Sequence, residues 1–267
     1  MSATTDVPRR LTTADIAKRH ADGGRLAMLT AYDFPTAQIL DEAGIPLLLV
    51  GDSLGQVLLG YESTVRVTMT EMLHHTRAVV RGSKRALVIG DMPFLTYAAE
   101  SEAIDNAGRF LQEAGAQAVK VEGGVRSARI IEALVKAGIP VMGHIGWTPQ
   151  AQLGMGGKVK VIGKDRAQAR ALLADALAVQ EAGAFAIVLE LMPAQLAAAL
   201  TERLHIPTIG EAARAYAADV EAGAFPGEAQ TVRMDEGVLD EALGRGAPDR
   251  AGEWDIPAGG IPLDRDL

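Results

Sequence analysis

The stretch ALVIGDMPFLTYAAESEAIDNAGRFLQEAGAQAVKVEGG, residues 86–124, contains the unit that repeats along the whole chain. An apolar run ends near Asp91, a longer Ala- and Glu-rich segment with helical spacing ends at Gly115, and a second apolar run ends near Glu122. Short continuous apolar runs are typical of strands buried on both faces. Glycine is expected after a helix because it enters the left-handed conformation easily. The stretch therefore predicts strand, helix, strand.

The same pattern recurs on both sides of this stretch. Further apolar runs lie at residues 26–33, 46–53, 140–147, 185–193 and 206–210. Strands and helices that alternate without a change in composition predict parallel strands joined by right-handed crossovers in one domain. The length of 267 residues suits an α/β fold of the (β/α)8 TIM type, which typically has about 250 residues.

A doubly wound sheet would show the same alternation, so the positions of polar residues decide between the two folds. Six of them fall at or near the C-terminal end of a different apolar run: Asp33, Asp52, Asp91, Glu122, His144 and Glu190. In a barrel these ends meet at one mouth, where active sites are built. The positions therefore favour a barrel.

The alternation stops after seven apolar runs. Gly210 is followed directly by residues 211–225, which have helical spacing, so we expect the eighth β/α unit to be missing. We expect residues 1–227 to form one barrel domain and residues 228–267 to form a mostly irregular tail. Residues 230–234, QTVRM, alternate weakly between polar and apolar side chains. We hypothesise that they form a strand in the gap left by the missing unit.

Composition argues against several classes of protein. A net charge of −8 leaves no excess positive charge for a phosphate backbone, so we expect no nucleic acid partner. The absence of cysteine excludes disulfides, iron–sulfur clusters and thiolate zinc sites. No apolar run approaches the roughly 18–20 residues that cross a bilayer, and no signal peptide is visible. We therefore expect a cytoplasmic protein without a membrane span.

Three acidic residues follow strongly apolar segments: Asp52, Asp91 and Glu122. Carboxylates held close together repel one another, and a hard divalent cation relieves the repulsion. Mg2+ suits such a site because it needs only a few carboxylates beside waters and substrate oxygens. The alternative is that these are ordinary strand-end residues that cap helices.

Lys120 lies two residues before Glu122, so in a strand both side chains point to the same face. A lysine that faces the inside of a barrel is costly unless it meets an anion, which suggests a substrate carboxylate or a developing enolate. The alternative is a structural ion pair with Glu122. Ser53 could donate a hydrogen bond to the same anion or could cap a turn.

Glu190 ends the sixth apolar run, in a segment poor in other polar groups. Desolvation makes a carboxylate a stronger base, so Glu190 is the candidate proton acceptor. A structural pairing with an arginine is the alternative. His144 ends the fifth run and could bind a substrate oxygen, orient a carboxylate or simply be a buried histidine with its hydrogen bonds satisfied. These residues together suggest magnesium-assisted enolisation or aldol-type chemistry.

Six ordered motifs closely resemble the ketopantoate hydroxymethyltransferase family. They are TAYD (30–33), VGDSLG (50–55), DMPF (91–94), VKVEGG (119–124), GHIGWTPQ (143–150) and VLELMP (188–193). The resemblance implies hydroxymethyl transfer from methylenetetrahydrofolate to 3-methyl-2-oxobutanoate, which gives 2-dehydropantoate in pantothenate synthesis. It also implies a homo-oligomer, often a decamer in this family.

The resemblance further implies a role for each site residue. Asp52, Asp91 and Glu122 would bind Mg2+. The 2-oxo acid would be held by Asp52, Ser53, Asp91 and Lys120. Glu190 would accept the proton, and His144 could support it.

One departure from the family is plain in the sequence. Family members continue after the seventh strand with a glycine-rich loop and an eighth strand, whereas Gly210 here runs straight into Glu211. Two alternatives therefore remain at this point. One is a catalytically impaired barrel kept for assembly, and the other is an enzyme of the phosphoenolpyruvate mutase and isocitrate lyase type. Those lyases commonly use a catalytic cysteine, which this chain lacks.

Overall fold

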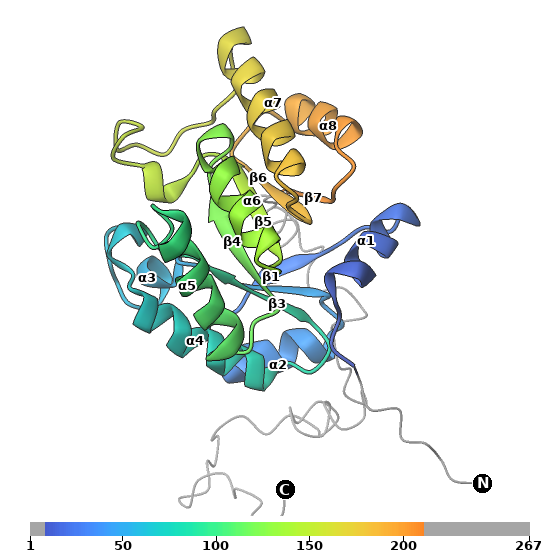
Figure 1. Ribbon diagram of the computed structural model, residues 1–267, viewed down its shortest axis with the longest axis vertical. Helices are drawn as coiled ribbons and strands as arrows, with labels where there is room; N and C mark the ends of the chain where they lie inside the picture. The colour runs from blue at the N-terminus through green and yellow to red at the C-terminus, as the bar shows by residue number, and fades with distance from the viewer. Residues whose placement is uncertain (1–8, 211–267) are drawn as a thin grey trace, which may run out of the picture. The chain divides into compact units, whose positions relative to one another are not determined.

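All seven predicted strands are present in a computed structural model of the chain, which describes residues 9–210 (Figure 1). They are β1 (Met28–Thr30), β2 (Leu47–Val50), β3 (Leu87–Asp91), β4 (Ala118–Glu122), β5 (Val141–Gly146), β6 (Ala186–Glu190) and β7 (Thr208–Gly210). The strands are parallel, and each pairs with its neighbours along the chain in the order β1 to β7. The fold is a nearly closed (β/α) barrel, which confirms the predicted fold class.

Helices connect the strands and cover the outside of the barrel (Figure 1). They are α1 (Thr13–Ala21), α2 (Phe34–Glu42), α3 (Leu54–Val57), α4 (Met69–Gly82), α5 (Glu100–Gln112), α6 (Ala128–Lys136), α7 (Arg166–Glu181) and α8 (Ala194–Arg203). Short 3-10 turns occur at η1 (Thr64–Arg66), η2 (Val125–Ser127) and η3 (Pro149–Ala151). None of the helices found between residues 9 and 210 has the length and apolarity needed to span a membrane.

The strands are buried on both faces, as their continuous apolar runs predict. In β2, Leu48 and Val50 belong to the layer between the strands and the helices, whereas Leu47 and Leu49 belong to the interior of the barrel. This alternation has a period of two, because successive side chains of a strand point to opposite faces. The barrel interior is therefore a packed core that supports the residues at the strand ends.

Helix α1 was not anticipated by the strand and helix pattern. Thr12 caps it, since the threonine side chain accepts a hydrogen bond from Asp15 N while the Asp15 side chain accepts one from Thr12 N. Ile16 of this helix is fully buried in the interior core, together with Leu47 and Leu87 from the first positions of β2 and β3. Helix α1 therefore closes the barrel at the N-terminal ends of its strands.

The first and last strands each pair on one side only within the described residues, β1 with β2 and β7 with β6. The predicted tail, the boundary at residue 227 and the QTVRM segment lie outside the described residues.

Gly90 and Gly108 provide a matched test of packing against α5. A Cβ added at Gly90 would lie 2.3 Å from Cδ1 of the fully buried Phe110, whereas a Cβ at Gly108 meets nothing within 4 Å. We expect Gly90→Ala to lower the free energy of unfolding by about 1–3 kcal/mol, because overpacking strains the core. Gly108→Ala should leave it equal or raise it by up to about 1 kcal/mol, because alanine favours the helix. Urea unfolding of both variants measures the effect, and equal stabilities would contradict this account.

Candidate active site

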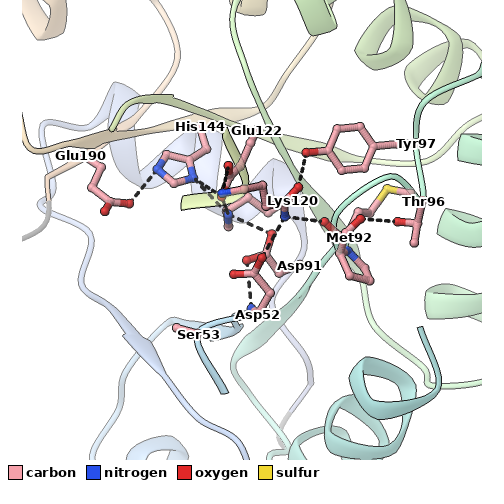
Figure 2. Close-up of polar contacts among 12 residues, drawn as sticks. Asp52, Ser53, Asp91, Met92, Thr96, Tyr97, Lys120, Glu122, His144 and Glu190 are labelled. Atoms are coloured by element: carbon pink, nitrogen blue, oxygen red, sulfur yellow. Dashed lines mark hydrogen bonds and ion pairs between the residues drawn. The ribbon is translucent and has the colours of Figure 1, made fainter. Parts of the chain in front are cut away.

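Three adjacent strands bring four of the predicted site residues together at their C-terminal ends. In the strand register Asp91 of β3 lies opposite Lys120 of β4, and Glu122 of β4 lies opposite His144 of β5. Each of these side chains is almost completely buried. Because Lys120 and Glu122 are two positions apart, they share the inner face of β4, as expected. The mouth of the barrel thus carries a compact polar cluster (Figure 2).

The ammonium group of Lys120 lies at the centre of this cluster. Its Nζ is 2.8 Å from Oδ1 of Asp91 and 3.9 Å from Oε1 of Glu122. It also donates to Nδ1 of His144 over 3.1 Å. The ion pair with Glu122 that the sequence left open is therefore present, although the Asp91 contact is much closer. The contacts of this ammonium thus join β3, β4 and β5 at the mouth of the barrel.

Asp52 and Ser53 follow β2 and lie beside Asp91. The backbone N–H of Asp52 donates to Oδ2 of Asp91 over 3.1 Å. Ser53 begins α3 without capping it through its side chain, and its hydroxyl oxygen lies 2.9 Å from the hydroxyl of Tyr32. Ser53 therefore presents a polar group at the mouth instead of capping a turn. Asp33, by contrast, caps α2 by accepting a hydrogen bond from Thr36 N.

Glu190 is connected to the cluster through His144. Oε2 of Glu190 is 2.8 Å from Nε2 of His144, and the Glu190 side chain keeps 17% of its exposure to solvent. Its ion-pair partner within residues 9–210 is this histidine, and no arginine of that range pairs with it. Figure 2 shows Glu190 at one side of the cluster and the carboxylates Asp52 and Asp91 on the other side of His144.

The backbone around Glu190 is tightly constrained. Gly146 of β5 has a φ of +96°, and a Cβ at this position would lie 2.1 Å from the carbonyl oxygen of Glu190. Trp147 N donates to the same oxygen over 3.0 Å. Leu191, the next residue, has a φ of +45°, which is uncommon for a residue with a side chain. The end of β6 is therefore fixed in one position next to β5.

Burial and mutual charge set the protonation of the carboxyl groups. Burial, reinforced by the charge of Asp91, raises the pKa of Asp52 to about 8. Burial also raises the pKa of Asp91, in spite of its contact with Lys120. For Glu122, burial would raise the pKa, but the contact with His144 and the charge of Lys120 lower it. The cluster thus combines the Asp52 carboxyl, which has a raised pKa, with the Glu122 carboxyl, which has a lowered pKa.

The two cationic groups are held by the same carboxylates. Burial alone would lower the pKa of Lys120, but the charges of Asp91 and Glu122 raise it above its usual value. Burial and Lys120 would lower the pKa of His144, but its contacts with Glu122 and Glu190 raise it to about 9. In the protonated ring, as in the neutral tautomer with its hydrogen on Nε2, the Nε2 proton is directed at Glu190 Oε2 over 2.8 Å.

Gln150 joins the carboxylates and was missed by the sequence analysis. Its Nε2 donates to Oδ2 of Asp52 over 2.9 Å, its backbone N–H donates to Oε2 of Glu122 over 3.1 Å, and its Oε1 accepts from the Tyr97 hydroxyl over 2.5 Å. Gln150 is the last residue of the GHIGWTPQ motif, which was the only signal for it in the sequence. It positions two carboxylates from different strands at once.

The donor set fits a hard divalent cation. No three His, Asp or Glu side chains among residues 9–210 converge closely enough to form a complete metal cage. Mg2+ does not require one, since it keeps several waters and binds through one or two carboxylates together with substrate oxygens. In the described part of the chain, the buried Glu122 Oε1 accepts no hydrogen bond, and the buried Asp91 Oδ1 has only its ion pair with Lys120. Carboxylate oxygens of this kind are preferred ligands of Mg2+.

Comparison with known proteins gives a consistent result. The family model for ketopantoate hydroxymethyltransferase matches residues 10–213. A 3-methyl-2-oxobutanoate hydroxymethyltransferase from Chloroflexus aurantiacus is 54% identical over 277 aligned positions, which cover 88% of this chain and 97% of that protein. The enzyme of the same name from Dehalococcoides mccartyi is 60% identical over 202 positions, 75% of this chain and 71% of that protein.

The longer alignment also bears on the eighth β/α unit. It has 277 positions, whereas 88% of 267 residues is about 235, and the difference leaves about 40 positions of the Chloroflexus protein without a partner in this chain. A strand, a helix and their loops need about 30 residues or more. The missing length is therefore enough for one β/α unit, and the family match ends at residue 213, close to the place where we expect the loss.

Solved structures with the same fold are more distant in sequence. A phosphonopyruvate hydrolase in complex with oxalate and Mg++ has a TM-score of 0.54 at 15% identity, and covers 88% of this chain and 96% of that one. A 2,3-dimethylmalate lyase of the PEP mutase/isocitrate lyase superfamily has a TM-score of 0.51 at 14% identity, with 88% and 99% covered. These similarities support the barrel fold.

The raised pKa of Asp52 predicts how stability depends on pH. In the folded protein this carboxyl holds its proton up to a pH of about 8, whereas an unfolded carboxyl loses it near pH 4. The folded state therefore binds more protons in this interval, and stability falls as the pH rises from about 4 to about 8. Asp52→Asn keeps the shape and removes the charge. In chelator we expect this variant to exceed wild type by on the order of 2–4 kcal/mol at pH 8.

Urea unfolding at pH 8 and near pH 4 checks this expectation. Near pH 4 the advantage of Asp52→Asn should nearly disappear, because the Asp52 carboxyl is then protonated in the folded state and about half protonated in the unfolded state. A difference in stability that stays the same at both pH values would show that Asp52 is not the titrating group.

Proposed function

Because the chain belongs to the ketopantoate hydroxymethyltransferase family, we propose that it transfers a hydroxymethyl group from methylenetetrahydrofolate to 3-methyl-2-oxobutanoate through the enolate of that oxo acid. The products are 2-dehydropantoate and tetrahydrofolate. The carbon comes from the folate methylene group, and one water molecule supplies the oxygen of the new hydroxyl. The observation that carries the proposal is the buried Lys120 ammonium between carboxylates, with Glu190 held nearby by His144.

The proposed binding of the oxo acid follows from the charges at the mouth. Lys120 supplies a fixed positive charge, and the Ser53 hydroxyl supplies a hydrogen-bond donor. Asp52, Asp91 and Glu122 would hold Mg2+ at the same place. When bound, a divalent cation polarises the ketone and stabilises negative charge on its oxygen. The oxo acid would then present its C3 proton to a base.

Glu190 is the proposed proton acceptor at C3. Its side chain is half-buried at the mouth, so it is accessible to a substrate and shielded on one side. His144 positions the carboxylate through the contact between Nε2 and Oε2. Gly146 and Trp147 constrain the backbone that carries this base.

The alternatives are less well supported. Relatives that are 46–60% identical carry the name 3-methyl-2-oxobutanoate hydroxymethyltransferase, whereas the similarity to the PEP mutase and isocitrate lyase superfamily is at 13–17% identity. That distance supports a shared fold alone. The impaired barrel is not favoured, because all proposed site residues lie in the described strands and loops. From membership in this family we also propose that the protein is cytoplasmic and forms a homo-oligomer.

Proton NMR of 3-methyl-2-oxobutanoate in deuterated buffer tests the reaction. With protein, Mg2+ and methylenetetrahydrofolate we expect 2-dehydropantoate to form, and with Mg2+ alone we expect the C3 proton signal to disappear by exchange. A chelator should reduce both rates by at least about 100-fold, because the ketone is no longer polarised. If folded protein with Mg2+ gives neither exchange nor product, the proposed function is wrong and the impaired barrel replaces it.

Glu190→Gln tests the proposed base. The amide keeps the size of the side chain and can still contact His144, but it cannot accept the C3 proton. We expect the rate of C3 exchange to fall by about 10²–10⁴-fold, while the calorimetric affinity for 3-methyl-2-oxobutanoate in Mg2+ stays within about twofold of wild type. Exchange at the wild-type rate would assign the proton transfer to another group.

A further inference from the structure

A cavity of about 260 Å3 adjoins the polar cluster, with which it shares Glu122 and Gln150. Glu122 and Gln150 form its polar floor. Tyr97, which also lines the cavity, lies on the opposite side of the cluster from Glu190 in Figure 2. Because Glu122 belongs both to this lining and to the polar cluster, the cavity lies next to the proposed oxo acid site.

The walls of the cavity are mainly apolar and aromatic. They come from the loop after β3 and from α6 and η3, with Phe94, Leu95, Tyr97, Ala98, Ile130 and Ala151 as lining residues. Leu95 is 61% exposed, and Val125 beside the cavity is 59% exposed. Pockets with apolar walls and few polar groups are typical of sites for small organic ligands, which occupy about 300–1,000 Å3. The volume here suits the ring system of a larger ligand.

Arg126 adds a positive charge to this lining. It lies in η2, directly after the loop that follows Glu122, and its side chain folds back so that Nε would be 2.6 Å from a Cβ at Gly123. The other arginine of this segment, Arg129, pairs with Glu100. Arg126 has no ion pair or hydrogen bond from its side chain to any residue between 9 and 210. A guanidinium without a partner, next to an aromatic cavity, is suited to a carboxylate on the ligand.

We propose that this cavity binds the one-carbon donor, with its rings between Tyr97 and Ile130 and a tail carboxylate on Arg126. The inference rests on the proposed function, because methylenetetrahydrofolate is an aromatic ring compound with carboxylates on its tail. It must bring its methylene carbon to the C3 atom of an oxo acid held by Lys120. A second cavity, lined by His20 and Phe185, lies at the N-terminal ends of the strands and is too remote for this.

Arg126→Gln tests the charge, with Arg129→Gln as the matched control on the neighbouring turn. We expect Arg126→Gln to raise the KM for methylenetetrahydrofolate at least about tenfold, the usual effect of losing a charge-assisted hydrogen bond. Arg129→Gln should stay within twofold of wild type. With a donor that lacks the glutamate tail, methylenetetrahydropteroate, Arg126→Gln and wild type should have equal KM values. A KM for Arg126→Gln equal to that of Arg129→Gln would overturn the role of Arg126.

Ala98→Trp tests the cavity itself. Ala98 is exposed at its edge, so a tryptophan can fill the space without disturbing the core. Calorimetry with tetrahydrofolate should show at least tenfold weaker binding than wild type, and unchanged binding would overturn the location.

This measurement also separates the cavity proposal from the proposed function. Wild type could bind tetrahydrofolate without catalysing C3 exchange, while Arg126→Gln and Ala98→Trp bind it more weakly. That result would support the cavity proposal and contradict the proposed chemistry. If tetrahydrofolate does not bind to wild type, the cavity proposal falls.

Discussion

The active site depends on one buried ammonium group. A lysine charge at the inner face of a barrel is tolerated only where carboxylates compensate it, and Lys120 has Asp91 on the neighbouring strand and Glu122 on its own. The carboxylates in turn require the cation, because without it three buried acids would lie together. Breaking a buried pair of this kind typically costs about 3–5 kcal/mol. Each of these residues thus constrains the others, and the strand register that aligns Asp91 with Lys120 fixes all of them.

Two further residues, Gln150 and His144, turn this cluster into an ordered site. Gln150 joins Asp52, which follows β2, to Glu122 at the end of β4, so that carboxylates from separate strands share one positioning residue. His144 joins the cluster to Glu190 on β6. The proposed metal site and the proposed base are therefore linked through side chains and not only through the barrel backbone. Small residues such as Gly146 permit the close approach of strands that this linkage needs.

The sequence predicted those features that follow from periodicity. Asp91, Lys120, Glu122 and His144 end apolar runs, and parallel strands of a barrel bring such ends together whatever the loops do. Gln150 and Tyr97 escaped because both follow strands by several residues, where the loop conformation and not the strand period sets the direction of a side chain. Asp33 shows the opposite error: it ends an apolar run, yet it caps a helix, since β1 stops three residues earlier. Helix α1 was missed because only Ile16 anchors it fully in the core.

The order of the strands shows how the described part of the barrel can form without the eighth β/α unit that the sequence predicts to be missing. Every strand pairs with the strand that precedes or follows it in the sequence. The six pairings from β1–β2 to β6–β7 therefore need no residue after Gly210. Connections of this kind are local, which favours stepwise assembly from the N-terminus during synthesis. The loss that we expect after Gly210 would therefore spare the strands that carry the polar cluster, β3, β4 and β5.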